Sequence, residues 1–513
     1  MARYVMSNRR AGRFRESDQR ASRGAMSATL QSLPGEARIV GDNAPDDALA
    51  RHTVLFEADP VEVAALRASA PDTVIIEPEI VHHHLTTCPP PDFLGTAPAR
   101  LDALREPDAA SRTPTTRLRA TLVGGGAPLA NAEAQLFLRG DGGVQRRLVE
   151  RSDAAGRVAF AVPAPFVPAL MNVVPAAGFW SVGVRAPRDG QAIDCPALPA
   201  DGPIGWWHRA VGAARPGRTR GRGLRVGVVD TGVGPHPALD HVVDIGSFID
   251  GVFDRTGGAD SDVHGSHVCG TVGARPVEGG RYAGIAPGAR LYSARVFPPD
   301  SGANQMDISD AIDTLSRDHA VDLINLSLGA PVGSEIERDA IRDALERGTL
   351  CVCAAGNANG PVGFPAAFPE TVAVAALGLE GWGPPGSLSA GRLPESAARF
   401  GTGNLYLANF SDFGPEITCA APGVGIVSTV PASGAAGGTS GNPYAALDGT
   451  SMASPVACGA LAARLAGDAL YRTLPRDETR AAYARRALIE SCRDIGLDPA
   501  FQGRGVPTLG VPA

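Results

Sequence analysis

Apolar and polar positions alternate in a regular way over the C-terminal part of the chain. Two stretches, 308–319 and 336–347, place apolar residues at helical spacing. Around them lie four apolar runs of strand length, at 225–229, 291–296, 323–326 and 350–355. This alternation predicts an α/β domain over 224–510, with a parallel sheet and helices on both of its faces. Functional side chains are then expected at the carboxyl ends of the strands.

The segments before residue 115 have a different pattern. Residues 1–48 are polar and rich in arginine, and they are expected to be disordered. Residues 49–86 predict a small β-α-β unit with strands near 53–56 and 73–76 around a helix at 60–69. It ends in His82-His83-His84. This cluster could bind a metal, but without a second cluster a solvated loop is favoured.

Two further segments separate this unit from the α/β domain. The proline-rich residues 87–114 are typical of a linker. Residues 115–198 contain short alternating strands and turn signals, and they predict a small β-sandwich. A second linker is expected at 199–223, where the Arg/Gly-rich part 214–223 is either a solvated tether or a processing site.

Composition limits the function. The net charge of -7 gives no reason to expect a nucleic-acid partner. No apolar run is long enough to span a membrane, and residues 1–26 lack the apolar core of a signal peptide. The eight cysteines are scattered, which favours free buried thiols over a disulfide framework. These features predict a cytoplasmic location.

Four residues carry candidate chemistry, and each also has an ordinary structural explanation. Ser451 precedes the apolar run 456–465 and could simply cap a helix. Asp230 ends a predicted strand and could close a turn, as could Asn357. His264 could act as a general base, or it could bind zinc together with His267 and Cys269.

The order of these residues decides between the explanations. The motifs Asp230-Thr231-Gly232, His264 to Gly270, Ser327-Leu328-Gly329, Ala354 to Asn357 and Gly449 to Pro455 stand in this order. In these motifs the chain resembles the subtilisin-like serine peptidases, from about residue 224 to residue 509.

The resemblance implies a subtilisin-like sheet and a serine endopeptidase acting on proteins or peptides without a cofactor. It implies that Ser451 is the nucleophile, His264 the general base, Asp230 the residue that orients it, and Asn357 an oxyanion donor, whereas His267 is structural. It also implies a pro-domain role for residues 49–86. A catalytically idle protein that binds through its β-sandwich is the alternative.

The same resemblance suggests the substrate contacts. Ser327, Leu328 and Gly329 would pair with the substrate backbone, and Ala355, Gly356 and Gly363 would line a primary pocket suited to a large apolar side chain. Calcium sites cannot be matched, although Asp250, Asp254, Asp260 and Asp262 carry suitable oxygen ligands. Cys269 replaces the usual alanine, and it predicts sensitivity to thiol reagents.

Overall fold

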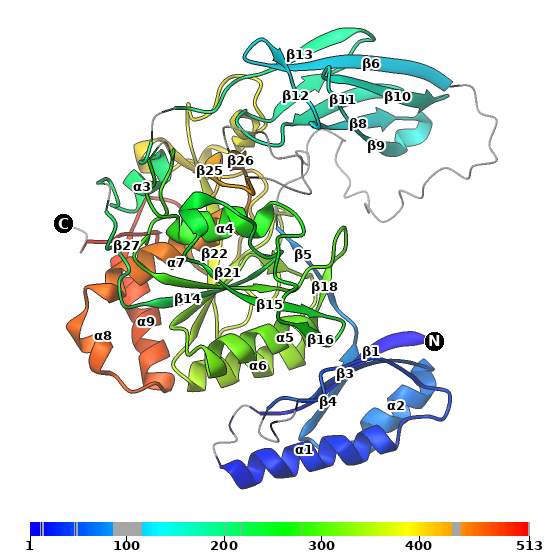
Figure 1. Ribbon diagram of the computed structural model, residues 1–513, viewed down its shortest axis with the longest axis vertical. Coiled ribbons are helices and arrows are strands. Elements are labelled where there is room, and N and C mark those ends of the chain that lie inside the picture. Colours follow the sequence, from blue (N-terminus) through cyan, green and yellow to red (C-terminus); the bar gives the residue numbers. More distant parts are fainter. Residues whose placement is uncertain are drawn as a thin grey trace.

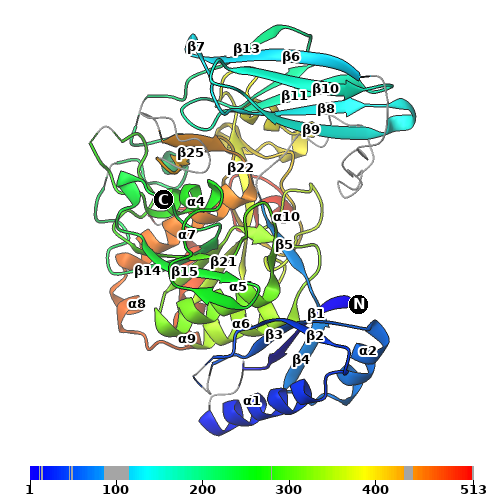
Figure 2. The same cartoon turned by 45° about the vertical axis from the view of Figure 1, so that its right-hand side comes forward.

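Three units lie along the long axis of the protein, as Figure 1 shows. The structure is a computed structural model that describes residues 1–510 except 11, 13, 14, 46, 48, 49, 86–114, 201, 216, 279 and 433–442. We call them the N-terminal unit (residues 1–85), the two-sheet unit (residues 115–198) and the central unit (residues 224–510). Figure 2 shows the central unit between the other two. The linker predicted at 87–114 lies outside the described residues.

The N-terminal unit is a four-stranded antiparallel sheet with two helices. Its elements are β1 (Ala2–Asn8), α1 (Glu16–Gln31), β2 (Arg38–Asp42), β3 (Thr53–Ala58), α2 (Pro60–Ser69) and β4 (Val74–Pro78), in the strand order β2-β3-β1-β4. One face of the sheet packs on α1 and α2 through Met6, Phe56 and Met26. The other face places Val5 and Leu55 against the central unit.

The expectation of a disordered segment at 1–48 is therefore wrong. The run Tyr4-Val5-Met6 is short and stands among arginines, so its pattern alone is weak. It becomes a central strand because it pairs on both edges with strands that follow more than 45 residues later. Strand β1 also lies between β3 and β4, so the unit is larger than the predicted β-α-β segment.

The two-sheet unit consists of two sheets that pack around one core. Its strands are β6 (Thr115–Gly124), β7 (Ala127–Pro128), β8 (Glu133–Arg139), β9 (Gln145–Arg151), β10 (Arg157–Pro163), β11 (Val167–Val174), β12 (Val182–Arg185) and β13 (Gln191–Cys195). One sheet has the order β10-β6-β13 with β7 beside β6, and the other has the order β12-β11-β8-β9. Leu122, Leu136 and Phe160 are buried in the core shared by both sheets.

The expected linker at 199–223 contains a short buried helix, α3 (Trp206–Ala210). Trp206 and Trp207 are buried in the core of the central unit, and Trp207 packs on Tyr282 with ring centroids 4.9 Å apart. The linker interpretation is wrong for this part. A solvated tether would leave both tryptophan side chains exposed to water, whereas here they are buried.

The central unit is built on a largely parallel sheet. The strands are β14 (Arg225–Asp230), β15 (Val243–Ile249), β16 (Val252–Asp254), β17 (Arg290–Arg295), β19 (Leu323–Leu326), β21 (Leu350–Ala354), β22 (Val372–Leu379), β23 (Leu405–Leu407) and β24 (Ile417–Pro422). Their order is β16-β15-β17-β14-β19-β21-β22-β23, and β24 also pairs with β22. Only β16 and β23 run antiparallel to their neighbours in this sheet. The four predicted strands are adjacent at its centre, as an α/β fold requires.

Helices cover both faces of this sheet (Figure 1). Helices α4 (His264–Gly273) and α7 (Thr450–Ala466) lie on one face, and α5 (Gln305–Asp313) and α6 (Glu335–Glu346) lie on the face nearer the N-terminal unit. The remaining elements are α8 (Ala469–Thr473), α9 (Glu478–Ser491), α10 (Pro499–Gln502), β25 (Ile426–Thr429), β26 (Tyr444–Leu447), β27 (Cys492–Arg493) and β28 (Val506–Pro507). No helix in the described ranges is long and apolar enough to cross a membrane.

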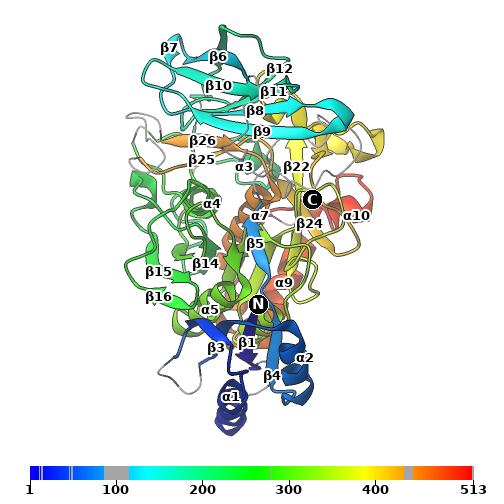
Figure 3. The ribbon, with the colours of Figure 1, turned by 90° about the vertical axis from the view of Figure 1, so that its right-hand side faces the viewer.

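One strand of the N-terminal unit leaves its sheet and enters the central unit. Strand β5 (Val81–His84) lies between β18 (Ala303–Asn304) and β20 (Leu328–Gly329) of the central unit, antiparallel to both. Figure 3 shows β5 as a blue strand crossing the central unit towards α7.

Candidate active site

The four candidate residues stand at the ends of elements that converge near the start of α7. Asp230 is the last residue of β14, and His264 is the first residue of α4. Ser451 is the second residue of α7, and Asn357 follows β21 by three residues. All but Asn357 are buried. Because the carboxyl ends of parallel strands share one edge, the fold brings together side chains that are far apart in sequence.

Asp230 and His264 form a buried pair. The Nδ1 atom of His264 lies 2.6 Å from Oδ1 of Asp230, and the same oxygen accepts the backbone N–H of Thr231 at 2.7 Å. Burial disfavours an imidazolium, but the Asp230 carboxylate outweighs burial, so the pKa of His264 is raised. The hydrogen bond at Nδ1 leaves Nε2 as the atom that can exchange a proton.

Ser451 contacts the N-terminal unit directly. Its Oγ donates a hydrogen bond to the carbonyl oxygen of Ser327 at 2.9 Å and accepts one from the N–H of Leu85 at 3.0 Å. Nε2 of His264 has no hydrogen-bond partner among the described residues. The ring of His84 packs against the His264 ring instead, with centroids 4.8 Å apart. Residues His84 and Leu85 therefore occupy the space around both side chains.

Asn357 points at the carbonyl group of the same leucine. Its Nδ2 donates to the Leu85 oxygen at 2.5 Å, while its Oδ1 accepts from the N–H and the hydroxyl of Thr450 at 3.0 and 2.9 Å. A Cβ on Gly449 would lie 2.3 Å from the Leu85 oxygen, so only glycine fits there. The Leu85 carbonyl thus lies at the N-terminus of α7, where backbone N–H groups and the helix dipole favour negative charge.

The predicted substrate-binding segment pairs with β5. Leu328 lies opposite His84, and Gly329 lies opposite His83. The N–H of Leu85 also donates to the Ser327 carbonyl at 3.3 Å. A Cβ on Gly329 would meet Cδ1 of Leu85 at 3.1 Å, so the leucine side chain lies directly over this glycine. The segment therefore accepts an extended chain through main-chain hydrogen bonds.

The other predicted pocket residues lie beside this segment. The N–H of Gly363 donates to the Ala355 carbonyl at 2.9 Å, and a Cβ on Gly363 would meet the Ala330 oxygen at 3.2 Å. Gly356 has a φ of +123° and packs against Asp412, which leaves no room for a side chain. Because residues 355, 356 and 363 are small, backbone atoms form most of this wall of the predicted pocket.

Comparisons with known proteins show the family of the chain. The family model of the subtilase family matches residues 221–503. The chain belongs to the subtilase family. The resemblance noted in the sequence is thereby confirmed, and the peptidase region coincides with the central unit and the segment just before it.

Curated relatives match about half of this subtilase. Subtilisin DY from Bacillus licheniformis is 31% identical over 292 residues, which are 56% of this chain and 89% of the relative. The major intracellular serine protease of Bacillus subtilis (strain 168) is 32% identical over 311 residues, 57% of this chain and 83% of the relative. A thermophilic serine proteinase from Bacillus sp. (strain AK1) is 34% identical over 249 residues, 48% of this chain and 52% of the relative.

The two histidines of the subtilase motif have different surroundings. Nε2 of His267 lies 2.9 Å from the Ile426 carbonyl and 3.2 Å from that of Ala445, whereas His264 faces Asp230. The described part of the chain contains no group of three or more His, Cys, Asp or Glu side chains arranged to hold a metal ion. No such group is therefore formed by the triple histidine, by His264, His267 and Cys269, or by the aspartates at 250, 254, 260 and 262.

Cys269 differs from its sequence-based expectation. The side chain is fully buried on α4, and burial raises the pKa of its thiol far above the usual value. A thiol that is both inaccessible and protonated does not react readily, so sensitivity to thiol reagents at this residue is no longer expected.

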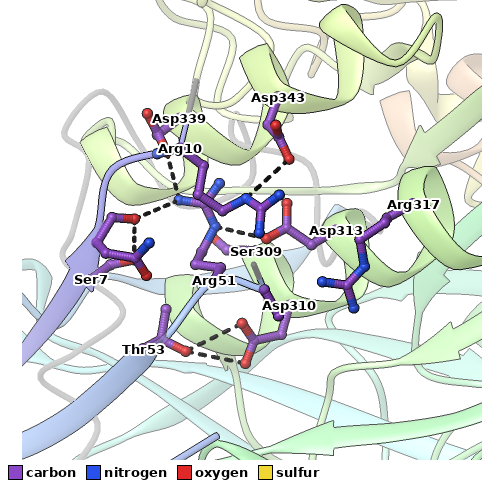
Figure 4. A network of polar contacts seen from close by, with 12 residues as sticks. Ser7, Arg10, Arg51, Thr53, Ser309, Asp310, Asp313, Arg317, Asp339 and Asp343 are labelled. Atoms are coloured by element: carbon purple, nitrogen blue, oxygen red, sulfur yellow. Dashed lines mark hydrogen bonds and ion pairs between the residues drawn. The ribbon is translucent and has the colours of Figure 1, made fainter. Parts of the chain in front are cut away.

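At a second place, away from Ser451, the N-terminal unit contacts the central unit through a buried charge network. Figure 4 shows Arg10 and Arg51 among aspartates of α5 and α6. Arg51 contacts Asp313 at 2.8 Å and Asp339 at 2.6 Å, and both partners have side chains less than a tenth exposed. Burial opposes the charge of Arg51, but the aspartates outweigh it, and its pKa is raised. The buried charges of this network are therefore paired only while the two units stay together.

Sequence reasoning missed several residues at this site. Thr450 lies within the serine motif, but its contact with Asn357 is not visible in the sequence. Glu337, which faces His82, belongs to no motif at all. The sequence pattern at the triple histidine favours a solvated loop. That interpretation is wrong for His82, which is fully buried in the central unit.

Proposed function

We propose that this subtilase is a serine endopeptidase with Ser451 as nucleophile, His264 as general base and acid, and Asp230 as the residue that orients His264. Asn357 and the backbone N–H of Ser451 form the oxyanion hole. The observation that carries the proposal is Leu85, whose carbonyl oxygen accepts from Asn357 while its N–H donates to the Ser451 hydroxyl. A peptide held in this way has its carbonyl carbon beside the nucleophile.

The reaction follows from these positions. Ser451 Oγ attacks the carbonyl carbon and loses its proton to Nε2 of His264, and the oxyanion that forms is held by Asn357 and the helix N-terminus. The C–N bond then breaks as His264 gives the proton to the leaving amine. Water next attacks the acyl-enzyme, its proton passing to His264, and Ser451 is released together with a carboxylic acid. The chemistry needs no cofactor.

We infer that residues 1–85 are a pro-segment and that the enzyme cleaves its own Leu85–Thr86 bond. Three contacts support this role: the pairing of β5 with β20, the Leu85 carbonyl on Asn357, and His84 packed on His264. In this state Ser451 donates to Ser327 instead of His264. The bound segment thus blocks the site after cleavage until it leaves. We propose a cytoplasmic location, which the similarity to the major intracellular serine protease of Bacillus subtilis (strain 168) supports.

Replacing the nucleophile tests both roles together. Wild-type protein should react with a fluorophosphonate probe, hydrolyse casein and yield a chain that begins at Thr86. Ser451→Ala should stay at full length and should lose at least about four orders of magnitude of activity. Intact-mass and N-terminal analysis measure the cleavage. A wild-type protein that neither labels nor cleaves casein would contradict the peptidase, and an active protein that keeps residues 1–85 attached would contradict self-cleavage.

A further inference from the structure

The triple histidine fills the cleft of the proposed peptidase, and its three side chains have unequal surroundings. Because successive side chains of a strand point to opposite faces, His82 and His84 share one direction and His83 has the other. His82 is fully buried, His84 is half-buried and His83 is exposed. His82 is the fourth residue before the proposed scissile bond, and it is held most closely.

The partner of His82 is a single carboxylate. Nε2 of His82 lies 3.1 Å from Oε2 of Glu337, and both side chains are 0% exposed. Oε1 of Glu337 and Nδ1 of His82 have no hydrogen-bond partner among the described residues. Within the described ranges, His82 is also the only ion-pair partner of Glu337. The ion pair of Glu337 therefore depends on the side chain that occupies this pocket.

The fold holds Glu337 in place. It is in the first turn of α6, and its N–H donates to the capping hydroxyl of Ser334 at 3.0 Å. Burial, together with the nearby Glu337 carboxylate, raises the pKa of the Cys351 thiol on β21. The carboxylate thus lies against a buried apolar strand and cannot turn to bulk water.

Resting on the proposed function, we propose that Glu337 makes the pocket select substrates with histidine as the fourth residue before the cleaved bond. When residues 1–85 leave, the pocket opens with a carboxylate at its wall. A substrate imidazole can donate a ring N–H to it. An apolar side chain of the same size would cover the carboxylate without pairing it, and leaving a buried acceptor unpaired is costly.

Fluorogenic tetrapeptides that share Ala-Ala-Leu after a variable first residue test this selectivity on the processed enzyme. Histidine is compared with thienylalanine, a ring of similar size without nitrogen, and with alanine. Moving the histidine one place along, to give Ala-His-Ala-Leu, supplies a control of the same composition. We expect histidine in the first place to raise kcat/KM about 10- to 100-fold over thienylalanine, and the moved histidine to lose this gain.

Matched variants on α6 locate the effect. Glu337→Gln keeps the side-chain volume but removes the charge, and it should reduce the preference for histidine at least about fivefold. Glu335→Gln makes the same change two residues earlier, where the side chain is 54% exposed, and it should keep the wild-type preference. If Glu337→Gln does not fold, the peptide comparison on wild-type enzyme still decides.

The outcomes separate this inference from the proposed function. Equal cleavage of the histidine and thienylalanine peptides, with normal fluorophosphonate labelling, overturns the selectivity and leaves the peptidase intact. A preference that survives in Glu337→Gln overturns the role of Glu337. No cleavage of any peptide and no labelling would reject the peptidase itself, and the selectivity would fall with it.

Discussion

The N-terminal unit and the two-sheet unit attach to the central unit in different ways. The N-terminal unit contributes buried arginines to aspartates of α5 and α6, and one strand to the candidate site. Its apolar contact is small, with Val5, Leu55 and Ile75 against Met306 and Ile336. Polar groups of this kind can be hydrated again after separation, so the contact suits a segment that leaves.

The two-sheet unit instead joins the core of the central unit. Trp180, which precedes β12, is 3% exposed and packs on Trp382 with ring centroids 5.8 Å apart. Backbone hydrogen bonds from Gly183 to Gly386 and from Leu388 to Ser181 add to this contact. Exposing a buried tryptophan side chain to water has a high cost in free energy. The difference supports the proposal that the N-terminal unit leaves after cleavage, whereas the two-sheet unit stays attached.

The largest expected effect is on the binding of the N-terminal unit. Arg51→Ala leaves Asp313 and Asp339 buried without their cation, which should weaken binding of residues 1–85 by about 4 kcal/mol, or roughly 1000-fold. The dissociation constant of labelled 1–85 from the processed chain measures this change. Arg38→Ala, at a side chain that is 71% exposed, is the control and should change binding little. Equal effects of the two variants would contradict the role of the buried network.

A smaller effect on stability is expected at the contact between the two-sheet unit and the central unit. Trp180→Ala should lower the free energy of unfolding of the processed chain by about 3 kcal/mol, because a large buried ring is lost beside Trp382. Denaturant unfolding followed by circular dichroism measures it. Val149→Ala removes a side chain that is 43% exposed in the same unit and should change stability little. A two-sheet unit that dissociates intact from active wild-type enzyme would break the comparison.

Local pattern predicted the centre of the molecule and failed at its contacts. Strands β14, β17, β19 and β21 can be predicted because each is a mostly apolar run of strand length. Strand β1 is not, since its burial depends on β3 and β4. The candidate residues could be named from their motifs, but the meeting of His82 with Glu337 joins positions 255 residues apart. No local signal encodes such a distance.

The smallest expected effect is a pH dependence in the binding of residues 1–85, caused by the titration of His84. Burial and the nearby His264 lower the pKa of His84 to about 4, although Asp262, 3.6 Å away, and Asp230 act in the opposite direction, and His83 adds to the lowering. A histidine whose pKa is depressed in the complex favours binding above its ordinary pKa of about 6.5. That contribution is lost as the pH falls from about 6.5 towards 4.

Binding of residues 1–85 should therefore weaken on the order of tenfold between pH 7.5 and pH 5 through His84. His84→Phe keeps a ring against His264 but cannot titrate, so its binding should lose this part of the pH dependence. His264 titrates in both proteins, so the difference between wild type and variant isolates His84. The dissociation constants of both proteins at the two pH values measure it, and identical pH profiles would show that His84 has no part in release.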